Sequence, residues 1–209
     1  LIGGGEVGGK ARGIAFAFNA VMGSPLESVV DFPDVNYVVT TEGFDEFVSD
    51  NGIEALLREN VESNEESSDE DNSQELFDKL SVAFQAGRIR SSLLQDLEGA
   101  LEAIGDFPLA IRSSSILEDS RKLSFAGKYG TRFSANIGSM EDRRNLLANA
   151  LKDVWASLYN PAARAYRKKH GLVDSDESMA VVIQPVIGRQ HNGMYYPEIA
   201  GTAFSKVYR

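Results

Sequence analysis

Cysteine is absent from this 209-residue sequence. The chain therefore has neither a disulfide framework nor a thiolate metal site, and it is compatible with a reducing compartment, so we expect a cytoplasmic protein. Long apolar runs are also missing, since none approaches the roughly 18 residues that a membrane span requires, and no signal peptide is recognisable. We therefore expect no membrane partner.

Basic residues are outnumbered, with 21 Lys and Arg against 31 Asp and Glu and a net charge of −10. Seven of these acids lie between Glu62 and Glu75, where there is no base, and without them the net charge is about −3. No basic stripe dominates what is left, which argues against nucleic acid as the main partner. The two histidines, His170 and His191, are isolated from each other, so neither a Ser-His-Asp set nor a metal cluster is expected.

The acidic segment 62–73 is rich in Ser and Asn, and its composition does not support packing, so we expect a disordered loop there. The rest of the chain is long enough for one large or two small domains. The sequence begins inside a glycine-rich loop at Leu1 and ends at Arg209, just after a strand-like run. Both ends look cut, and we expect a piece of a longer protein.

Hydrophobic periodicity predicts mixed helices and strands, that is, an α/β or α+β fold. We expect helices at 11–22, from a cap at Thr40 or Thr41 through 48, at 53–60, 74–85 and 91–104, from a cap at Ser139 through about 158, and at 162–170. Strands are expected at 36–40, 109–111, 179–187 and 195–208. Ser139 and Asp142 have the spacing of a capping box, and Trp155 is expected in the core. The basic residues of the last helix are expected on a solvated face: Arg164, Arg167, Lys168 and Lys169.

The stretch 108–133 carries the clearest chemical signal. A short apolar strand ends in Arg112 followed by three hydroxyls, Ser113 to Ser115, and a guanidinium with small donors can clamp a phosphate. Further on, Gly127 lies between aromatic residues, where the backbone can approach a ligand closely. The alternative is that Arg112 pairs with Glu118 or Asp119 and that Gly127 is an ordinary turn residue. Composition and spacing alone favour this alternative.

The glycine-rich start nearly fits two phosphate-binding patterns. Gly3, Gly5 and Gly8 match the dinucleotide fingerprint, although no strand precedes them here, and the P-loop pattern ends with Ala11 in place of Ser or Thr. Both matches are weak. What they share is Lys10 at a helix start beside amide donors, which favours an anion, with a plain solvated lysine as the equal alternative.

The strand at 179–187 is interrupted by Gln184 and Pro185. Proline has no amide to donate to a sheet ladder, so this point is expected to be an interrupted edge. Free backbone groups there could meet a nucleotide base.

Six segments, in this order, resemble the nucleotide-binding domain shared by phosphoenolpyruvate synthase and pyruvate phosphate dikinase, and the resemblance runs from residue 3 to about 205. They are Gly-Gly-Lys-Ala-Arg-Gly (8–13), Thr-Thr-Glu-Gly-Phe-Asp-Glu-Phe (40–47), Leu-Ala-Ile-Arg-Ser-Ser-Ser-Ile-Leu-Glu-Asp-Ser (109–120), Ser-Phe-Ala-Gly-Lys-Tyr (124–129), Val-Trp-Ala-Ser-Leu-Tyr-Asn-Pro-Ala-Ala-Arg-Ala-Tyr-Arg (154–167) and Met-Ala-Val-Val-Ile-Gln-Pro-Val-Ile (179–187).

The resemblance implies an ATP-grasp fold that is incomplete on its C-terminal side, within residues 1–209, with 1–107 and 108–209 as candidate lobes. It implies that Lys10 and Arg112 contact the phosphates of ATP, with Arg112 also serving phosphoryl transfer. The remaining implied contacts are Gly127 and Thr131 over the phosphates, and Gln184 with the backbone near Val186 beside the adenine.

The same resemblance implies a phosphotransferase that passes phosphate from ATP to a carrier histidine outside this chain and then to pyruvate. The implied partners are ATP and the phosphohistidine and pyruvate-binding domains of the parent protein. Magnesium ligands are expected beyond this chain, so the chain alone is expected to be inactive and its own status as an enzyme stays open. The alternative is a catalytically silent, nucleotide-sensing regulatory module of a larger signalling protein.

Overall fold

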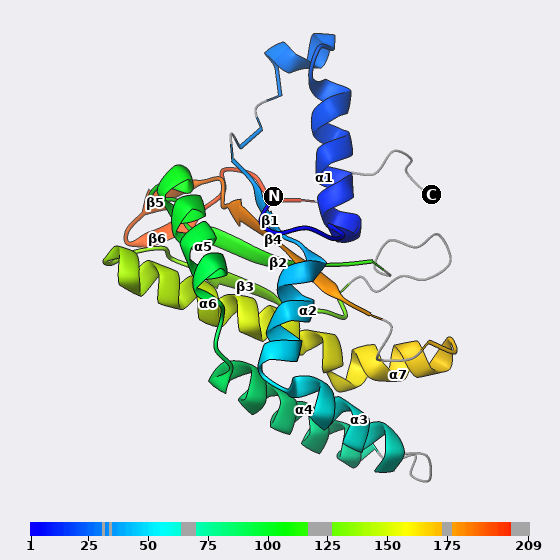
Figure 1. Ribbon diagram of the computed structural model, residues 1–209. Coiled ribbons are helices and arrows are strands. Elements are labelled where there is room, and N and C mark those ends of the chain that lie inside the picture. Colours follow the sequence, from blue (N-terminus) through cyan, green and yellow to red (C-terminus); the bar gives the residue numbers. More distant parts are fainter. Residues whose placement is uncertain (31, 34, 64–69, 117–126, 173–176, 202–209) are drawn as a thin grey trace.

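A computed structural model describes residues 1–30, 32–33, 35–63, 70–116, 127–172 and 177–201. Its helices are α1 (Gly8–Val21), α2 (Thr41–Asp50), α3 (Ile53–Ser63), α4 (Glu70–Ala86), α5 (Ser91–Ile104), α6 (Met140–Ala156) and α7 (Pro161–Lys169), with short 3-10 helices η1 (Pro25–Ser28) and η2 (Ser157–Tyr159). The strands are β1 (Tyr37–Val39), β2 (Leu109–Ser115), β3 (Thr131–Ser134), β4 (Met179–Pro185), β5 (Arg189–His191) and β6 (Met194–Tyr196). The fold is therefore α+β, as expected (Figure 1).

A four-stranded antiparallel sheet lies at the centre, in the order β1-β4-β2-β3. β4 pairs with β2 over residues 179–185 but with β1 only over residues 181–183, so the strand is central and its side toward β1 is open at Gln184 and Pro185, where the interrupted edge is expected. Pro185 is tolerated because it is the last residue of β4 and lies beyond the residues that pair with β1. The two candidate lobes share this sheet, since β1 comes from one half of the chain and β4 from the other.

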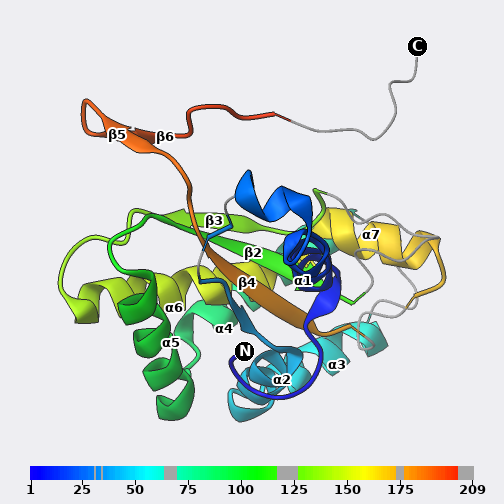
Figure 2. The same ribbon diagram turned by 90° about the horizontal axis from the view of Figure 1, so that it is seen from above.

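Helices cover both faces of the sheet (Figure 2). Helix α1 lies on one face, over a small apolar cluster that includes Ala11, Val38, Ala180 and Val182. The larger core lies on the other face, where α2 and α6 pack against the sheet and α4 and α5 pack against α6. Alternating residues of β2 and β4 thus divide between two layers, as side chains of a pleated strand must.

Trp155 is fully buried in the larger core, as predicted. Its ring packs against Phe44 and Phe47 of α2, with ring centroids 6.0 and 5.1 Å away, and its indole N–H donates to the carbonyl oxygen of Met179 at 3.2 Å. The buried polar tip is therefore satisfied while the ring joins α6, α2 and β4.

The helix signals agree with the structure in most places. Ser139 and Asp142 form the predicted capping box at the start of α6, and the side chain of Asn160 caps α7 before Pro161. The acidic segment 62–73 is partly helical, which its composition did not predict: α3 continues to Ser63 and α4 begins at Glu70. Residues 64–69 lie outside the described residues.

Candidate functional site

The site is built where the start of α1 meets β2. The hydroxyl of Ser114, which is fully buried, accepts a hydrogen bond from the backbone N–H of Ala11 at 3.1 Å and donates to the carbonyl oxygen of Val7 at 2.8 Å. Val7, the residue that precedes α1, makes no side-chain cap. A serine from the neighbouring strand therefore bridges the amide of Ala11 and the carbonyl of Val7, the first i to i−4 pair of the helix, and ties the start of α1 to β2.

Gly8 is the residue that permits this close contact. Its φ is +71°, and a Cβ added there would lie 1.8 Å from the carbonyl oxygen of Ser114. A side chain at position 8 would collide with backbone, which cannot move aside as a flexible side chain can. Gly8, the third glycine of the fingerprint-like pattern, is therefore needed for the packing of α1 on β2.

Arg112 lies in the middle of β2 rather than at the exit of a strand, because β2 continues through the three serines to Ser115. Its side chain is half-buried, and its Nη1 donates to Oε1 of Gln184 on β4 at 3.0 Å. Gln184 in turn donates from Nε2 to Oδ1 of Asn36 at 3.0 Å. Two of the sequence-predicted nucleotide residues are therefore hydrogen-bonded to each other on the face of the sheet that carries α1.

No carboxylate within the described ranges pairs with Arg112. Glu118 and Asp119, the alternative partners expected from the sequence, lie outside the described residues. The positive charge of Arg112 meets a neutral amide oxygen, so an anionic ligand would be a stronger partner than the one it has.

Lys10 lies in the first turn of α1, and its Nζ donates to the hydroxyl of Ser113 at 3.3 Å. Ser113 directly follows Arg112 on β2. The amine of Lys10 therefore reaches the residue next to Arg112 on β2, although about half the chain separates Lys10 from Arg112 in sequence, while the guanidinium of Arg112 reaches Gln184 on β4.

Thr131 is the first residue of β3 and is the cross-strand partner of Arg112. Gly127 is exposed, with φ +72°, and precedes β3 by four residues. Val186 follows the end of β4, and its backbone N–H donates to the carbonyl oxygen of Pro108 at 2.7 Å. Thr131 and Gln184 thus lie next to Arg112, whereas no contact joins Gly127 or Val186 to it among the described residues.

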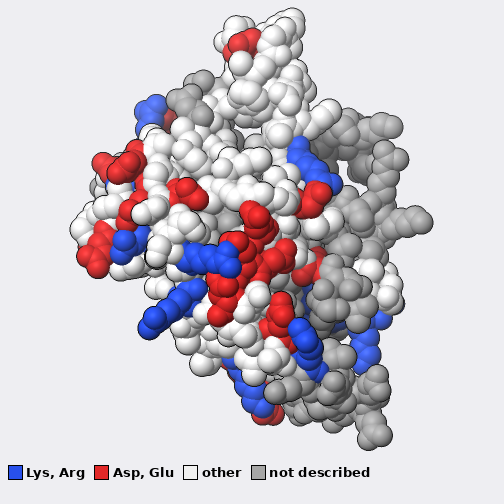
Figure 3. Space-filling view, in the orientation of Figure 1, with Lys and Arg blue, Asp and Glu red and all other residues white. Residues whose placement is uncertain are grey.

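Acidic side chains gather on another part of the surface, over α2 (Figure 3). Arg90 pairs there with Glu46 and Asp50, and this pairing holds the pKa of Asp50 below its usual range, mainly through the hydrogen bond. Arg90 therefore neutralises part of this acidic surface.

The sequence reading missed two features of this region. Ser113 and Ser114 were noted as donors to a ligand, but they also fasten Lys10 and the start of α1 to β2. Arg167 was expected on a solvated face and is fully buried, where it pairs with Glu177. That prediction was wrong because the helical position of a charge does not reveal a carboxylate brought in by a distant segment.

The start of α1 thus brings Lys10 to the hydroxyls of β2, next to Arg112 in this α+β domain, and cations beside a helix start favour an anion. The family model of the pyruvate phosphate dikinase AMP/ATP-binding domain matches residues 5–207, and the chain belongs to this family. Membership confirms the resemblance seen in the sequence and supports ATP as the ligand.

Several curated proteins are similar to the chain. A probable phosphoenolpyruvate synthase of Methanothermobacter thermautotrophicus is 28% identical over 207 residues, which are 97% of this chain and 29% of that protein. The phosphoenolpyruvate synthase of Aeropyrum pernix is 26% identical, over 91% of this chain and 22% of that protein. A rifampicin phosphotransferase of Bacillus cereus is 29% identical, over 81% and 18%.

The chain thus spans less than a third of the length of these relatives. Within its described part, the structure contains no helix long and apolar enough to cross a membrane.

Proposed function

We propose that the chain is the ATP-grasp-type, ATP-binding part of a phosphotransferase resembling phosphoenolpyruvate synthase and pyruvate phosphate dikinase. Lys10 and Arg112 hold the phosphates of ATP, and Gly127 and Thr131 lie over them. Gln184, with the backbone near Val186, borders the adenine. The observation that carries the proposal is that Lys10 contacts Ser113, the residue next to Arg112 on β2, and that Arg112 is held by an uncharged group on β4.

In the full-length protein, ATP loses a phosphoryl group at a phosphorus–oxygen bond while a phosphorus–nitrogen bond forms on a carrier histidine outside this chain. The phosphohistidine domain then delivers the group to pyruvate in a third domain. The residues of this chain position the phosphates and neutralise their charge, which is most of what phosphoryl transfer requires.

Magnesium would add charge neutralisation in the full-length protein. The described residues of this chain contain no group of three or more His, Cys, Asp or Glu arranged to hold a metal ion, so no step is assigned to one here.

The test is Arg112→Ala in the full-length protein, with ATP affinity measured by titration. We expect at least a tenfold loss, because hydrogen bonds to charged groups contribute about 1.5–3 kcal/mol. Arg58→Ala is the control, since Arg58 is an exposed arginine of α3 paired only with Glu54 among the described residues. An unchanged titration for Arg112→Ala would remove that residue from the site.

A second measurement addresses turnover. Incubation of the full-length protein with ATP labelled in its phosphates should give an acid-labile phosphohistidine. Binding of ATP without any labelled histidine would instead support the nucleotide-sensing module.

A further inference from the structure

The segment 128–130 is hydrogen-bonded to η2 and to the residue that caps α7. Asn160 donates from Nδ2 to the carbonyl oxygen of Lys128 at 2.6 Å. The backbone N–H of Gly130 donates to the hydroxyl of Ser157 at 2.7 Å. Ser157 and Asn160 thereby hold the backbone on either side of Tyr129.

Tyr129 itself ends in a buried polar network. Its hydroxyl lies 2.8 and 2.7 Å from the two carboxylate oxygens of Glu177, and Nη1 of Arg167 lies 3.1 Å from Oε2 of the same carboxylate. The hydroxyl of Ser115, at the end of β2, also donates to Glu177. The side chains of Arg167 and Glu177 are both fully buried, so this charge pair is shielded from solvent and each partner depends on the other.

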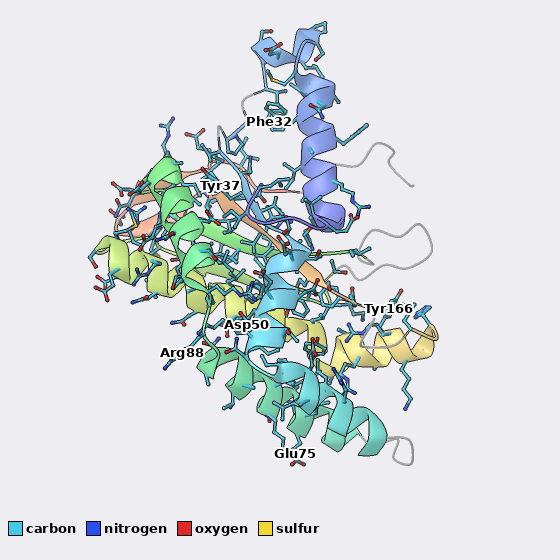
Figure 4. All side chains as sticks on the ribbon, viewed as in Figure 1. Phe32, Tyr37, Asp50, Glu75, Arg88 and Tyr166 are labelled. Atoms are coloured by element: carbon cyan, nitrogen blue, oxygen red, sulfur yellow. The ribbon has the colours of Figure 1, made fainter. Side chains whose placement is uncertain are left out.

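The residues of η2 and the start of α7 are also hydrogen-bonded to their own surroundings. Ser157 donates to the carbonyl oxygen of Val154 at 2.6 Å, and Asn160 accepts from the backbone N–H of Ala163 at 2.8 Å as the cap of α7. Arg167 donates from Nη2 to the carbonyl oxygen of Leu158 at 2.7 Å. Tyr166, labelled on α7 in Figure 4, lies under the amine of Lys128, 5.1 Å from the ring centroid.

The segment so held connects two of the residues proposed to face ATP. Gly127 precedes it and Thr131, the cross-strand partner of Arg112, follows it. The carbonyl oxygen of Gly130 also accepts from the backbone N–H of Ser113, at 3.4 Å. A displacement of residues 128–130 would therefore move Gly127 relative to Arg112 and would strain the pairing of Thr131 with Arg112.

We propose that Ser157, Asn160, Arg167 and Glu177 are positioning residues for nucleotide binding: they hold residues 128–130 so that Gly127 and Thr131 face the phosphates of ATP. None of the four touches the ligand in this arrangement. The inference rests on the proposed function, because ATP is the ligand whose binding it explains.

The test uses Ser157→Ala and Asn160→Ser in the full-length protein. Ser157→Ala removes the acceptor of the Gly130 amide, while serine at position 160 still caps α7 but is too short to reach Lys128. Two quantities are measured well below the melting temperature: hydrogen exchange of the amides of 128–131 without ligand, and the Kd for ATP. We expect faster exchange at these amides and a Kd raised at least fivefold in both variants.

Asn51→Ser is the matched control. Asn51 also ties two segments together through one amide, donating to the carbonyl oxygens of Phe47 and Arg88 and accepting from the N–H of Arg88. It should lower the melting temperature without changing the Kd or the exchange of 128–131.

Each outcome is decisive. Faster exchange with an unchanged Kd would overturn the positioning role, and so would unchanged exchange in both variants. A raised Kd in the control as well would show that the effect is general destabilisation. Failure of the wild-type protein to bind ATP would remove the proposed function and this inference with it, whereas a wild-type protein that binds ATP leaves the variants to decide the positioning role alone.

Discussion

At the scale of single residues, Arg167 and Glu177 show how far environment decides the role of a charge. Arg167 belongs to a run of basic residues at the end of α7, yet it is buried and its neighbours Lys168 and Lys169 are exposed. The attraction within a buried ion pair offsets the free-energy cost of removing both charges from water only if their remaining hydrogen bonds are also made. Here Tyr129 and Ser115 donate to Glu177, and Arg167 donates to a backbone carbonyl. Removing one partner would therefore cost more than removing a surface ion pair.

Tyr129 gives a pH prediction. Burial, and secondly the charge of Glu177, raise the pKa of Tyr129 above its ordinary value of 10.0. The unfolded chain releases this proton before the folded chain does, so the stabilisation is complete below pH 10 and is lost as pH rises above it.

The measurement is the free energy of unfolding of the wild type and of Tyr129→Phe across about pH 8 to 11. Phenylalanine has no proton to release, so the stability advantage of the wild type should shrink above pH 10, by up to about 1.4 kcal/mol per pH unit. A difference between the two proteins that stays constant over this range would contradict the prediction.

At the scale of elements, the contact between α1 and β2 places Lys10. Helix α1 is otherwise weakly attached: its buried residues are Gly8 and Ala11, and Phe16 further along is 76% exposed. The junction depends on the hydroxyl of Ser114 and on the missing side chain of Gly8. Changes at this junction should therefore affect both stability and the position of the amine.

Gly8→Ala tests this junction, and Gly13→Ala in the same helix is the control substitution. A methyl group at position 8 would meet the carbonyl oxygen of Ser114 in a positive-φ backbone, whereas nothing lies within 4 Å of a Cβ at position 13. We expect Gly8→Ala to lower the free energy of unfolding by about 2 kcal/mol or more and to weaken ATP binding.

Gly13→Ala should instead raise the free energy of unfolding by up to about 1 kcal/mol, because alanine is the better helix former. Denaturant titration and ATP titration of both variants check these outcomes. Equal effects of the two substitutions would show that the close approach at position 8 is not what holds the helix.

At the scale of the whole molecule, the two halves of the chain are joined through one sheet and one aromatic cluster. The ring of Phe47 on α2 packs in a tilted arrangement against Phe84 of α4, with centroids 5.5 Å apart, and against Trp155 of α6. β1 meanwhile pairs with β4. Cooperative unfolding of these parts is expected, since β1, the one strand that the described residues of the first half contribute, pairs with β4 of the second half.

Phe47→Ala should therefore destabilise the whole fold, by about 3–5 kcal/mol, because it removes a buried ring from a packed cluster. Unfolding followed by Trp155 fluorescence and by helix circular dichroism should shift together. Val82→Ala, at a position 70% exposed on α4, should change stability by no more than about 0.5 kcal/mol. Separate shifts of the two signals would mean that the halves unfold independently.

The sequence by itself determined the local structure and the family. Capping residues such as Ser139 and Asn160 act within their own helices, so their roles could be predicted from neighbours in the chain. The spacing of apolar residues predicts most of the helices and the strands β1, β2 and β4. Six motifs in order indicate a nucleotide-binding domain, and the family match confirms this.

Only the tertiary structure decided which strand is central, which charges are buried and which residues meet. Strand order depends on pairing between distant segments, so Pro185 could not reveal that β4 lies between β1 and β2. Likewise the partners of Arg167 and of residues 128–130 come from other elements. Burial and hydrogen bonding are properties of neighbours in space, and sequence spacing encodes those only within a single helix or strand.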